Sequence, residues 1–247
     1  MFNPGSGQMN SHMRIDHRLL SELRPMKIEV GIAKYAEGSA LLELGNTRVL
    51  VAATVEERVP SFLKGTGRGW VTAEYAMLPR ATQQRMAREQ GRGRSQEIQR
   101  LIGRSLRASV DLNGLGERSV ILDCDVLQAD GGTRTASISA AWVALIQALR
   151  WLRNQGRIEG IPLQAQVAAV SVGLVGEEIL LDLCYEEDSR AAVDFNVVMT
   201  DQNRLVELQG TGEGRTFSRP ELDRILDMAW SGIGQIFTLQ KEALGLR

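Results

Sequence analysis

The chain has 247 residues, of which 43% are hydrophobic and 24% are charged, and its formal net charge is −1. This composition is typical of a globular protein with one large core or two small ones, and the near-zero net charge gives no overall indication of nucleic-acid binding. No apolar run approaches the roughly 20 residues that a membrane-spanning helix needs, so we expect no membrane partner.

The first third of the chain is predicted to form short strands. Residues 1–12 lack a long apolar run, and we expect a disordered N-terminal extension there. Strands are predicted at Glu29–Ile32, Ala40–Leu44, Val49–Val55 and Trp70–Ala73, with a hairpin turn at Gly45-Asn46. The polar, arginine-rich segment that then runs to Arg94 is predicted to be a mobile surface loop.

A helix is predicted from Ser95 to about Leu112, because apolar residues recur there at helical spacing, namely Ile98, Leu101, Ile102 and Leu106. A buried strand at Val120–Leu127 and a helix at about Thr135–Leu152 follow. The polar segment Asn154–Pro162 is the best candidate for a boundary between two units.

The second half repeats the order of strands followed by a helix. Its predicted strands are Val167–Val175, Glu178–Tyr185, Ala192–Met199 and Leu205–Gln209, and a final helix runs from about Pro220 to Leu244. We therefore predict an α+β fold in which two similar units, residues 13–155 and 156–247, pack together in one compact subunit.

Cysteine and histidine are scarce, with two residues of each type. Cys124 and Cys184 both lie in predicted strands among apolar neighbours, so we expect free thiols and a reducing, cytoplasmic setting rather than disulfides or a metal cluster. His12 and His17 lie at the N-terminal edge, which argues against a Ser-His-Asp triad or an imidazole general base.

The connection between the buried strand and the following helix contains Gly131, Gly132, Thr133 and Arg134. Glycines adopt backbone conformations that other residues resist, and free amides at a helix start, a hydroxyl and a guanidinium together suit a tetrahedral anion. Arg134 opposes the helix dipole, which favours a bound anion that compensates for it. A turn that only caps the helix is the structural alternative, and neither a GxxxxGK[ST] loop nor a GxGxxG fingerprint is present.

A second candidate helix start is Gly91-Arg-Gly-Arg-Ser95, where Arg94 precedes the predicted N-cap Ser95. A solvated basic loop is its plain interpretation. Two helix N-termini that each bring an arginine would instead form a shared oxyanion clamp with Thr133 and Arg134.

Arginines are concentrated between Arg80 and Arg107, where eight arginines face two glutamates and no lysine occurs. Arginine without lysine favours recognition of phosphate by planar guanidinium groups. Arg80, Arg85 and Arg88 are spaced to follow successive phosphates of a flexible RNA strand, with loop solubility as the alternative.

Asp188 and Asp194 are the carboxylates that we single out. Asp194 lies inside an apolar segment, where a carboxylate is unfavourable unless it is paired or functional. Near an anion site, the two would hold a divalent cation or give a proton to a leaving oxygen. We expect the neighbouring Glu186 and Glu187 to be solvated, and Asp123 and Asp125 to be structural partners of arginines.

These groups together favour phosphoryl transfer, which depends on positioning and charge neutralisation. Since no protein nucleophile is evident, inorganic phosphate held by Thr133, Arg134 and Arg94 would itself attack a phosphodiester of RNA. The product would be a nucleoside diphosphate released from an RNA end.

At these residues the chain resembles the ribonuclease PH family of phosphate-dependent 3′-to-5′ exoribonucleases, from Met13 onward. The most specific match is Asp123-Cys-Asp-Val-Leu-Gln-Ala-Asp-Gly-Gly-Thr-Arg134. Further matching segments are Met13-Arg-Ile-Asp16, Glu22-Leu-Arg-Pro25, Trp70-Val-Thr-Ala-Glu-Tyr75, Met77-Leu-Pro-Arg80, Glu97-Ile-Gln-Arg-Leu-Ile102, Asn196-Val-Val-Met-Thr200 and Gln209-Gly-Thr211.

The resemblance implies a ribonuclease PH-type fold related to a ribosomal S5 domain. It implies phosphate binding at Arg94, Gly132, Thr133 and Arg134, catalytic or metal-binding roles for Asp188 and Asp194, and RNA contacts from Arg80, Arg85 and Arg88. It further implies Mg²⁺ as cofactor, inorganic phosphate as co-substrate, tRNA precursors with single-stranded 3′ tails as substrates, and a homohexamer built as a trimer of dimers.

Two alternatives remain at this point. One is a catalytically silent, exosome-like ring subunit that binds RNA for another enzyme, although the four residues Thr133, Arg134, Asp188 and Asp194 argue against it. The other is a metal-dependent hydrolase that uses water, which the lack of histidine and cysteine ligands disfavours.

Overall fold

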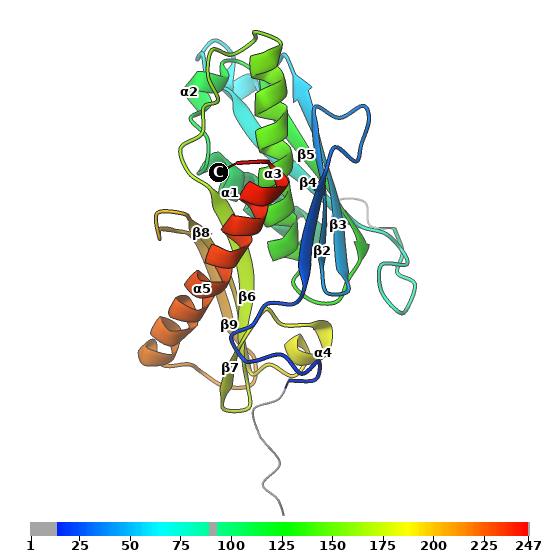
Figure 1. Ribbon diagram of the computed structural model, residues 1–247, viewed down its shortest axis with the longest axis vertical. Coiled ribbons are helices and arrows are strands. Elements are labelled where there is room, and N and C mark those ends of the chain that lie inside the picture. Colours follow the sequence, from blue (N-terminus) through cyan, green and yellow to red (C-terminus); the bar gives the residue numbers. More distant parts are fainter. Residues whose placement is uncertain (1–13, 89–92, 247) are drawn as a thin grey trace, which may run out of the picture.

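The computed structural model describes residues 14–88 and 93–246, so the predicted N-terminal extension (residues 1–12) and residues 89–92 of the arginine-rich loop lie outside it. The described strands form two sheets (Figure 1). The first has the order β1-β2-β3-β5-β4, with β1 Met26–Val30, β2 Gly38–Leu44, β3 Thr47–Glu56, β4 Trp70–Met77 and β5 Ser119–Gln128. The second has the order β7-β6-β8-β9, with β6 Val167–Val175, β7 Glu178–Leu181, β8 Val193–Thr200 and β9 Leu205–Gly212.

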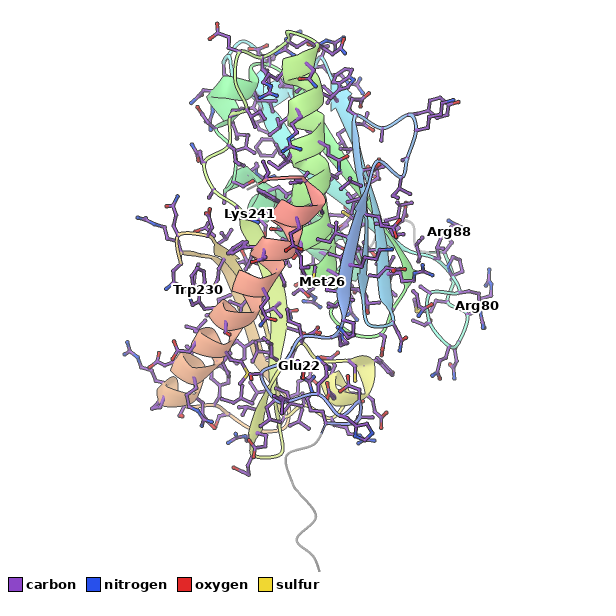
Figure 2. All side chains as sticks on the ribbon, viewed as in Figure 1. Glu22, Met26, Arg80, Arg88, Trp230 and Lys241 are labelled. Carbon is purple, nitrogen blue, oxygen red and sulfur yellow. The ribbon has the colours of Figure 1, made fainter. Side chains whose placement is uncertain are left out.

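Neighbouring strands pair antiparallel throughout, apart from β4 and β5, which are parallel. Parallel neighbours need a crossover connection, and α1 (Arg94–Arg107) lies in the segment that joins these two strands. β4 is at the edge of the first sheet, so the arginine-rich loop leaves the sheet at that edge (Figure 2).

The helix α3 (Thr133–Asn154) contacts both sheets, because it packs on β2 and β3 and also touches β6. It is therefore apolar nearly all round, as expected for a helix without a solvent-facing stripe, and Trp142, Leu145 and Leu149 are fully buried. The helix α5 (Arg219–Ala243) crosses the second sheet diagonally (Figure 1). Ser218 and Glu221 form a reciprocal capping box at its start.

Two clusters of buried apolar residues follow the two sheets. Val167, Ala169 and Val198 of the second sheet nevertheless belong to the cluster around α3. The division into units at residue 155 therefore stays a prediction.

Most predicted elements are present with small shifts, including the hairpin at Gly45-Asn46 and the helix after the glycine turn. Two predictions were wrong. First, helix α1 ends at Arg107 rather than near Leu112. The chain leaves the helical conformation there because Val110 pairs with Leu163, and Asp111 then caps the short helix α2 (Leu112–Leu115).

The last strand of the second hairpin also ends early, at Leu181 rather than Tyr185. Asp182 adopts a positive φ of 54°, which breaks the extended backbone. Cys184 is accordingly not in a strand and precedes the short helix α4 (Tyr185–Asp188). Both cysteines are free thiols. None of the described helices is long and apolar enough to cross a membrane.

Candidate active site

The site is built on the turn formed by Gly131 and Gly132, here called the glycine turn, between β5 and α3. Both residues have positive φ, 73° and 64°. A Cβ atom at Gly131 would lie 2.5 Å from the carbonyl oxygen of Leu183, so a side chain does not fit there. The sequence therefore needs glycine both for the backbone conformation and for the close approach to the segment before α4.

The first turn of α3 presents its amides without a capping side chain, because the N-cap is Gly132. Thr133 follows, and its Oγ1 lies 2.9 Å from the hydroxyl of Tyr75, which is buried on β4. Burial raises the pKa of Tyr75, and the hydrogen bond to Thr133 and the charges of Arg94 and Arg134 work in the opposite direction. The Tyr75–Thr133 pair and the two arginines thus share one region.

Arg94 and Arg134 come from the starts of two different helices. Gly93, with a φ of 61°, is the N-cap of α1, and Arg94 is its first residue. Arg134 is the second residue of α3, and its Nη1 donates to Oε1 of Gln209 on β9 at 3.1 Å. A shared anion clamp between these two glycine-capped helix starts stays a prediction. Gly91 and Arg92 of the predicted motif lie outside the described residues.

Asp188 is the last residue of α4, and Asp194 lies near the start of β8. Burial and the nearby negative charge of Asp188 raise the pKa of Asp194 to about 6, while Arg134 acts in the opposite direction. Desolvation also raises the pKa of Asp188, against the charges of Arg134 and Arg94. Arg134 is therefore close enough to both carboxylates, and Arg94 to Asp188, to favour their ionised forms.

Asp194 carries an unsatisfied oxygen. Its Oδ2 accepts a hydrogen bond from Nδ2 of Asn196 at 3.4 Å, but Oδ1 is buried without a hydrogen-bond partner among the described residues. A buried carboxylate oxygen without a partner is unfavourable in a structural role. Such an oxygen can ligate a cation or carry a proton.

The arginines of the loop after β4 are exposed. Arg80, Arg85 and Arg88 are solvent-facing, and no acidic side chain in the described part of the chain forms an ion pair with them. Figure 2 shows Arg80 and Arg88 projecting from the loop, beyond the edge of the first sheet. The guanidinium groups are thus available to an external phosphate chain.

Two expectations for carboxylates were wrong. Glu187 is not solvated: only 2% of it is exposed, and it accepts a hydrogen bond from Nε of Arg14 at 2.7 Å. Asp123 does not pair with arginine within the described residues, since it lies beside Glu74 and Asp125. Burial and these negative neighbours raise its pKa.

Sequence reasoning missed Tyr75, Gln209 and Glu213 as site residues. Tyr75 continues the inward alternation of Val71 and Ala73, so extending the predicted strand beyond Ala73 would have placed it inside. Glu213 raises the pKa of both Asp188 and Asp194 through its negative charge, and nothing in its surface-loop sequence indicates this proximity.

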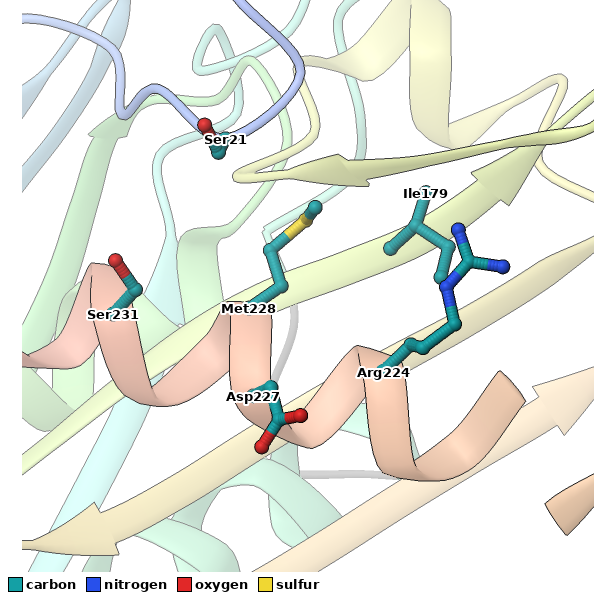
Figure 3. Close-up of a pocket in the computed structure, with 6 residues that line it drawn as sticks. All are labelled: Ser21, Ile179, Arg224, Asp227, Met228 and Ser231. Atoms are coloured by element: carbon teal, nitrogen blue, oxygen red, sulfur yellow. The ribbon is translucent and has the colours of Figure 1, made fainter. Parts of the chain in front are cut away.

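A separate groove between α5 and β7 is not part of this site. The side chains of Arg224 and Met228 rise from α5 toward Ile179 on β7 (Figure 3). It is lined by Ser21, Ile179, Arg224, Asp227, Met228 and Ser231, none of which is a predicted site residue.

Comparison with known proteins identifies the family. A sequence model of the 3′ exoribonuclease family, domain 1, matches residues 22–150, and one of domain 2 matches residues 165–232. The chain belongs to the 3′ exoribonuclease family. It is 57% identical to ribonuclease PH of Moorella thermoacetica over 237 residues, which cover 94% of this chain and 95% of that protein. It is 56% identical to ribonuclease PH of Bacillus cereus, with 94% and 97% covered.

Solved structures share the fold at lower identity. The Archaeoglobus fulgidus exosome with RNA bound to the active site has a TM-score of 0.77 at 26% identity, and covers 93% of this chain and 92% of that chain. Rice (Oryza sativa) Rrp46 has a TM-score of 0.76 at 19% identity, with 92% and 98% covered, and supports the fold alone.

These matches confirm the predicted α+β fold of the ribonuclease PH type and the predicted enzyme class. The chain is a phosphorolytic 3′ exoribonuclease. The exosome subunits are far less similar in sequence than the ribonuclease PH relatives, so the alternative of a silent ring subunit is disfavoured.

Proposed function

We propose that the glycine turn, Thr133, Arg134 and Arg94 bind the inorganic phosphate that degrades RNA. An oxygen of this phosphate bonds to the phosphorus of the last phosphodiester, and the bond from that phosphorus to the 3′ oxygen of the penultimate nucleotide breaks. The products are a nucleoside diphosphate and an RNA one nucleotide shorter. The supporting observation is that two glycine-capped helix starts bring Arg94 and Arg134 to the Tyr75–Thr133 pair.

The 3′ oxygen that leaves must take up a proton. Asp194, whose pKa burial and Asp188 raise to about 6, holds a proton far more readily than an ordinary aspartate at neutral pH. Burial raises the pKa of Asp188 as well, but the charges of Arg134 and Arg94 act against this shift. We propose Asp194 as the proton donor to the leaving oxygen, since environments that separate two carboxylates divide their roles.

Without that proton, Asp188 and Asp194 fit a divalent cation instead, because Asp194 Oδ1 is buried without a partner among the described residues and carboxylate oxygens are the ligands that Mg²⁺ prefers. No group of three or more His, Cys, Asp or Glu side chains that could hold a metal ion gathers within the described residues. Bound Mg²⁺ would neutralise negative charge on the phosphates.

We further propose that Arg80, Arg85 and Arg88 hold the RNA backbone. The proposed substrates are tRNA precursors with single-stranded 3′ tails in the cytoplasm. The proposed assembly is a homohexamer, built as a trimer of dimers. Three exposed guanidinium groups beyond the sheet edge suit a flexible phosphate chain. The homohexamer follows from the resemblance to the ribonuclease PH family.

The deciding experiment supplies RNA with a single-stranded 3′ tail and Mg²⁺, with and without phosphate. We expect nucleoside diphosphates only when phosphate is present. Nucleoside monophosphates in phosphate-free buffer would instead identify a hydrolase, and unchanged RNA would identify a binding subunit. Size-exclusion chromatography with light scattering measures the number of subunits.

A further inference from the structure

A buried ionic network lies directly behind the glycine turn. Its five charged members are each at most 6% exposed, and they are Arg14, Arg18, Arg24, Asp182 and Glu187. The network joins the segment before β1 to the end of β7 and to α4, which lie together at one end of the molecule (Figure 1). Buried charges are unfavourable unless they are well paired, so the precise partners of each group matter.

Arg24 connects the two sides of the candidate site. Its backbone amide and its Nε donate to Oδ2 of Asp182 at 2.8 and 2.9 Å, and its Nη2 donates to Oδ1 at 2.7 Å. On the other edge of the guanidinium, Nη1 donates to the carbonyl oxygen of Asp130, immediately before the glycine turn. A Cβ atom on Gly132 would lie 3.1 Å from Nη2, so the guanidinium lies against the turn itself.

Further contacts link the turn to α4. Asp130 Oδ1 accepts a hydrogen bond from the amide of Tyr185, the first residue of α4, at 3.1 Å. Thr47, fully buried, donates from Oγ1 to the carbonyl oxygen of Gly131 at 2.7 Å and accepts from the amide of Asp130 at 3.0 Å. Two side chains, those of Arg24 and Thr47, therefore hold the backbone of the turn in place through hydrogen bonds.

We infer that the Arg24–Asp182 pair positions the glycine turn for the binding of phosphate. The pair holds the turn against the β7–α4 segment, which carries Asp188. Neither residue belongs to the set that binds phosphate. The guanidinium group of Arg24 donates to the carbonyl oxygen of Asp130, before the turn, and to both carboxylate oxygens of Asp182, the residue that follows β7. This inference rests on the proposed function, because the position of the turn affects phosphate binding only if the turn binds phosphate.

The test compares variants that loosen the turn with one that loosens the core elsewhere. Asp182→Asn weakens the pair with little change of shape, and Arg24→Lys keeps the positive charge but loses the planar guanidinium. Thr47→Val removes the second contact without touching a charge. Gln240→Met is the control, because Gln240 is fully buried and donates to the carbonyl oxygens of Ser139 on α3 and Val167 on β6, neither of which belongs to the glycine turn. Each folded variant is assayed for the KM of phosphate, the KM of RNA and kcat.

We expect the turn variants to raise the KM of phosphate on the order of 10- to 100-fold, as for a binding group displaced by about 1 Å, with the KM of RNA within about twofold of wild type. Gln240→Met should lower the unfolding temperature and leave the KM of phosphate unchanged. An unchanged KM of phosphate in the folded turn variants, or an equal rise in the KM of RNA, overturns the inference. If Arg24→Lys and Asp182→Asn do not fold, Thr47→Val decides by the same criterion.

The proposed function fails in a different way. A wild-type protein that releases no nucleoside diphosphate with phosphate present would refute the proposed function before any variant is compared. Normal wild-type phosphorolysis with unaltered turn variants would refute only the positioning role.

Discussion

Replacing Asp194 by asparagine should stabilise the protein at neutral pH while it abolishes activity. The raised pKa of Asp194, about 6 against 3.8 for an ordinary aspartate, means that the folded state holds this proton more tightly than the unfolded state. Stability from this group is therefore complete below pH 3.8 and is lost as the pH rises through about 6. Asparagine has no charge to desolvate, so it avoids that loss.

The size follows from the shift. A difference of about two pKa units corresponds to about 3 kcal/mol at pH 7.5, and to about half of that at pH 5. We expect Asp194→Asn to gain up to this free energy of unfolding at pH 7.5, with a smaller gain at pH 5. Such a gain would mean that the carboxylate is retained for its chemistry at the expense of stability.

The assay is urea denaturation at both pH values, in phosphate-free buffer with a chelator, so that neither anion nor cation stabilises the folded state. Protein concentration stays fixed, because an oligomer unfolds at a concentration-dependent midpoint. Glu177→Gln, at an exposed turn, is the matched control and should change stability by at most about 0.5 kcal/mol. An Asp194→Asn protein no more stable than wild type at pH 7.5 would refute the reasoning.

Arg134→Ala should raise the KM of phosphate about 10- to 100-fold, since a hydrogen bond to a charged group contributes about 1.5–3 kcal/mol; unchanged phosphate saturation would exclude it from the clamp. Tyr75→Phe removes the partner of the Thr133 hydroxyl and should reduce kcat/KM for phosphate by about 3- to 10-fold, as expected for about 0.5–1.5 kcal/mol, with folding intact by circular dichroism. Kinetic constants equal to those of the wild type would show that the Thr133 hydroxyl does not depend on Tyr75 for its orientation. Arg85→Ala should weaken binding of long RNA at low salt and leave the KM of phosphate alone, with Arg58→Ala, paired with Glu56 on the surface, as control. RNA affinity equal to that of the control would reject the loop assignment.

Local pattern was sufficient for much of the fold. The apolar periodicity after the glycine turn predicted α3, and Gly45-Asn46 predicted a hairpin, because both signals lie within a few residues. The parallel pairing of β4 with β5 was not predictable in this way, since it depends on a crossover and on packing rather than on the composition of either strand.

The candidate site divides similarly. Local sequence context was sufficient to predict four site residues, namely Gly131, Thr133, Arg134 and Asp194. It did not predict the groups that hold them in place. Arg24 and Asp182 are 158 positions apart, and Glu187 has the sequence context of a solvated acid. Its burial arises only because Arg14, 173 positions away, reaches it.

The helix α3 begins at the anion site and remains enclosed by apolar neighbours from both sheets over most of its length. Local opening that frees such a helix requires separating both cores, so the amides of its buried turns, beyond the first turn that faces the site, should exchange with deuterium only through global unfolding. Phosphate thus meets donors whose orientation is already fixed before it arrives. Little ordering entropy is left to oppose the binding of so small a ligand.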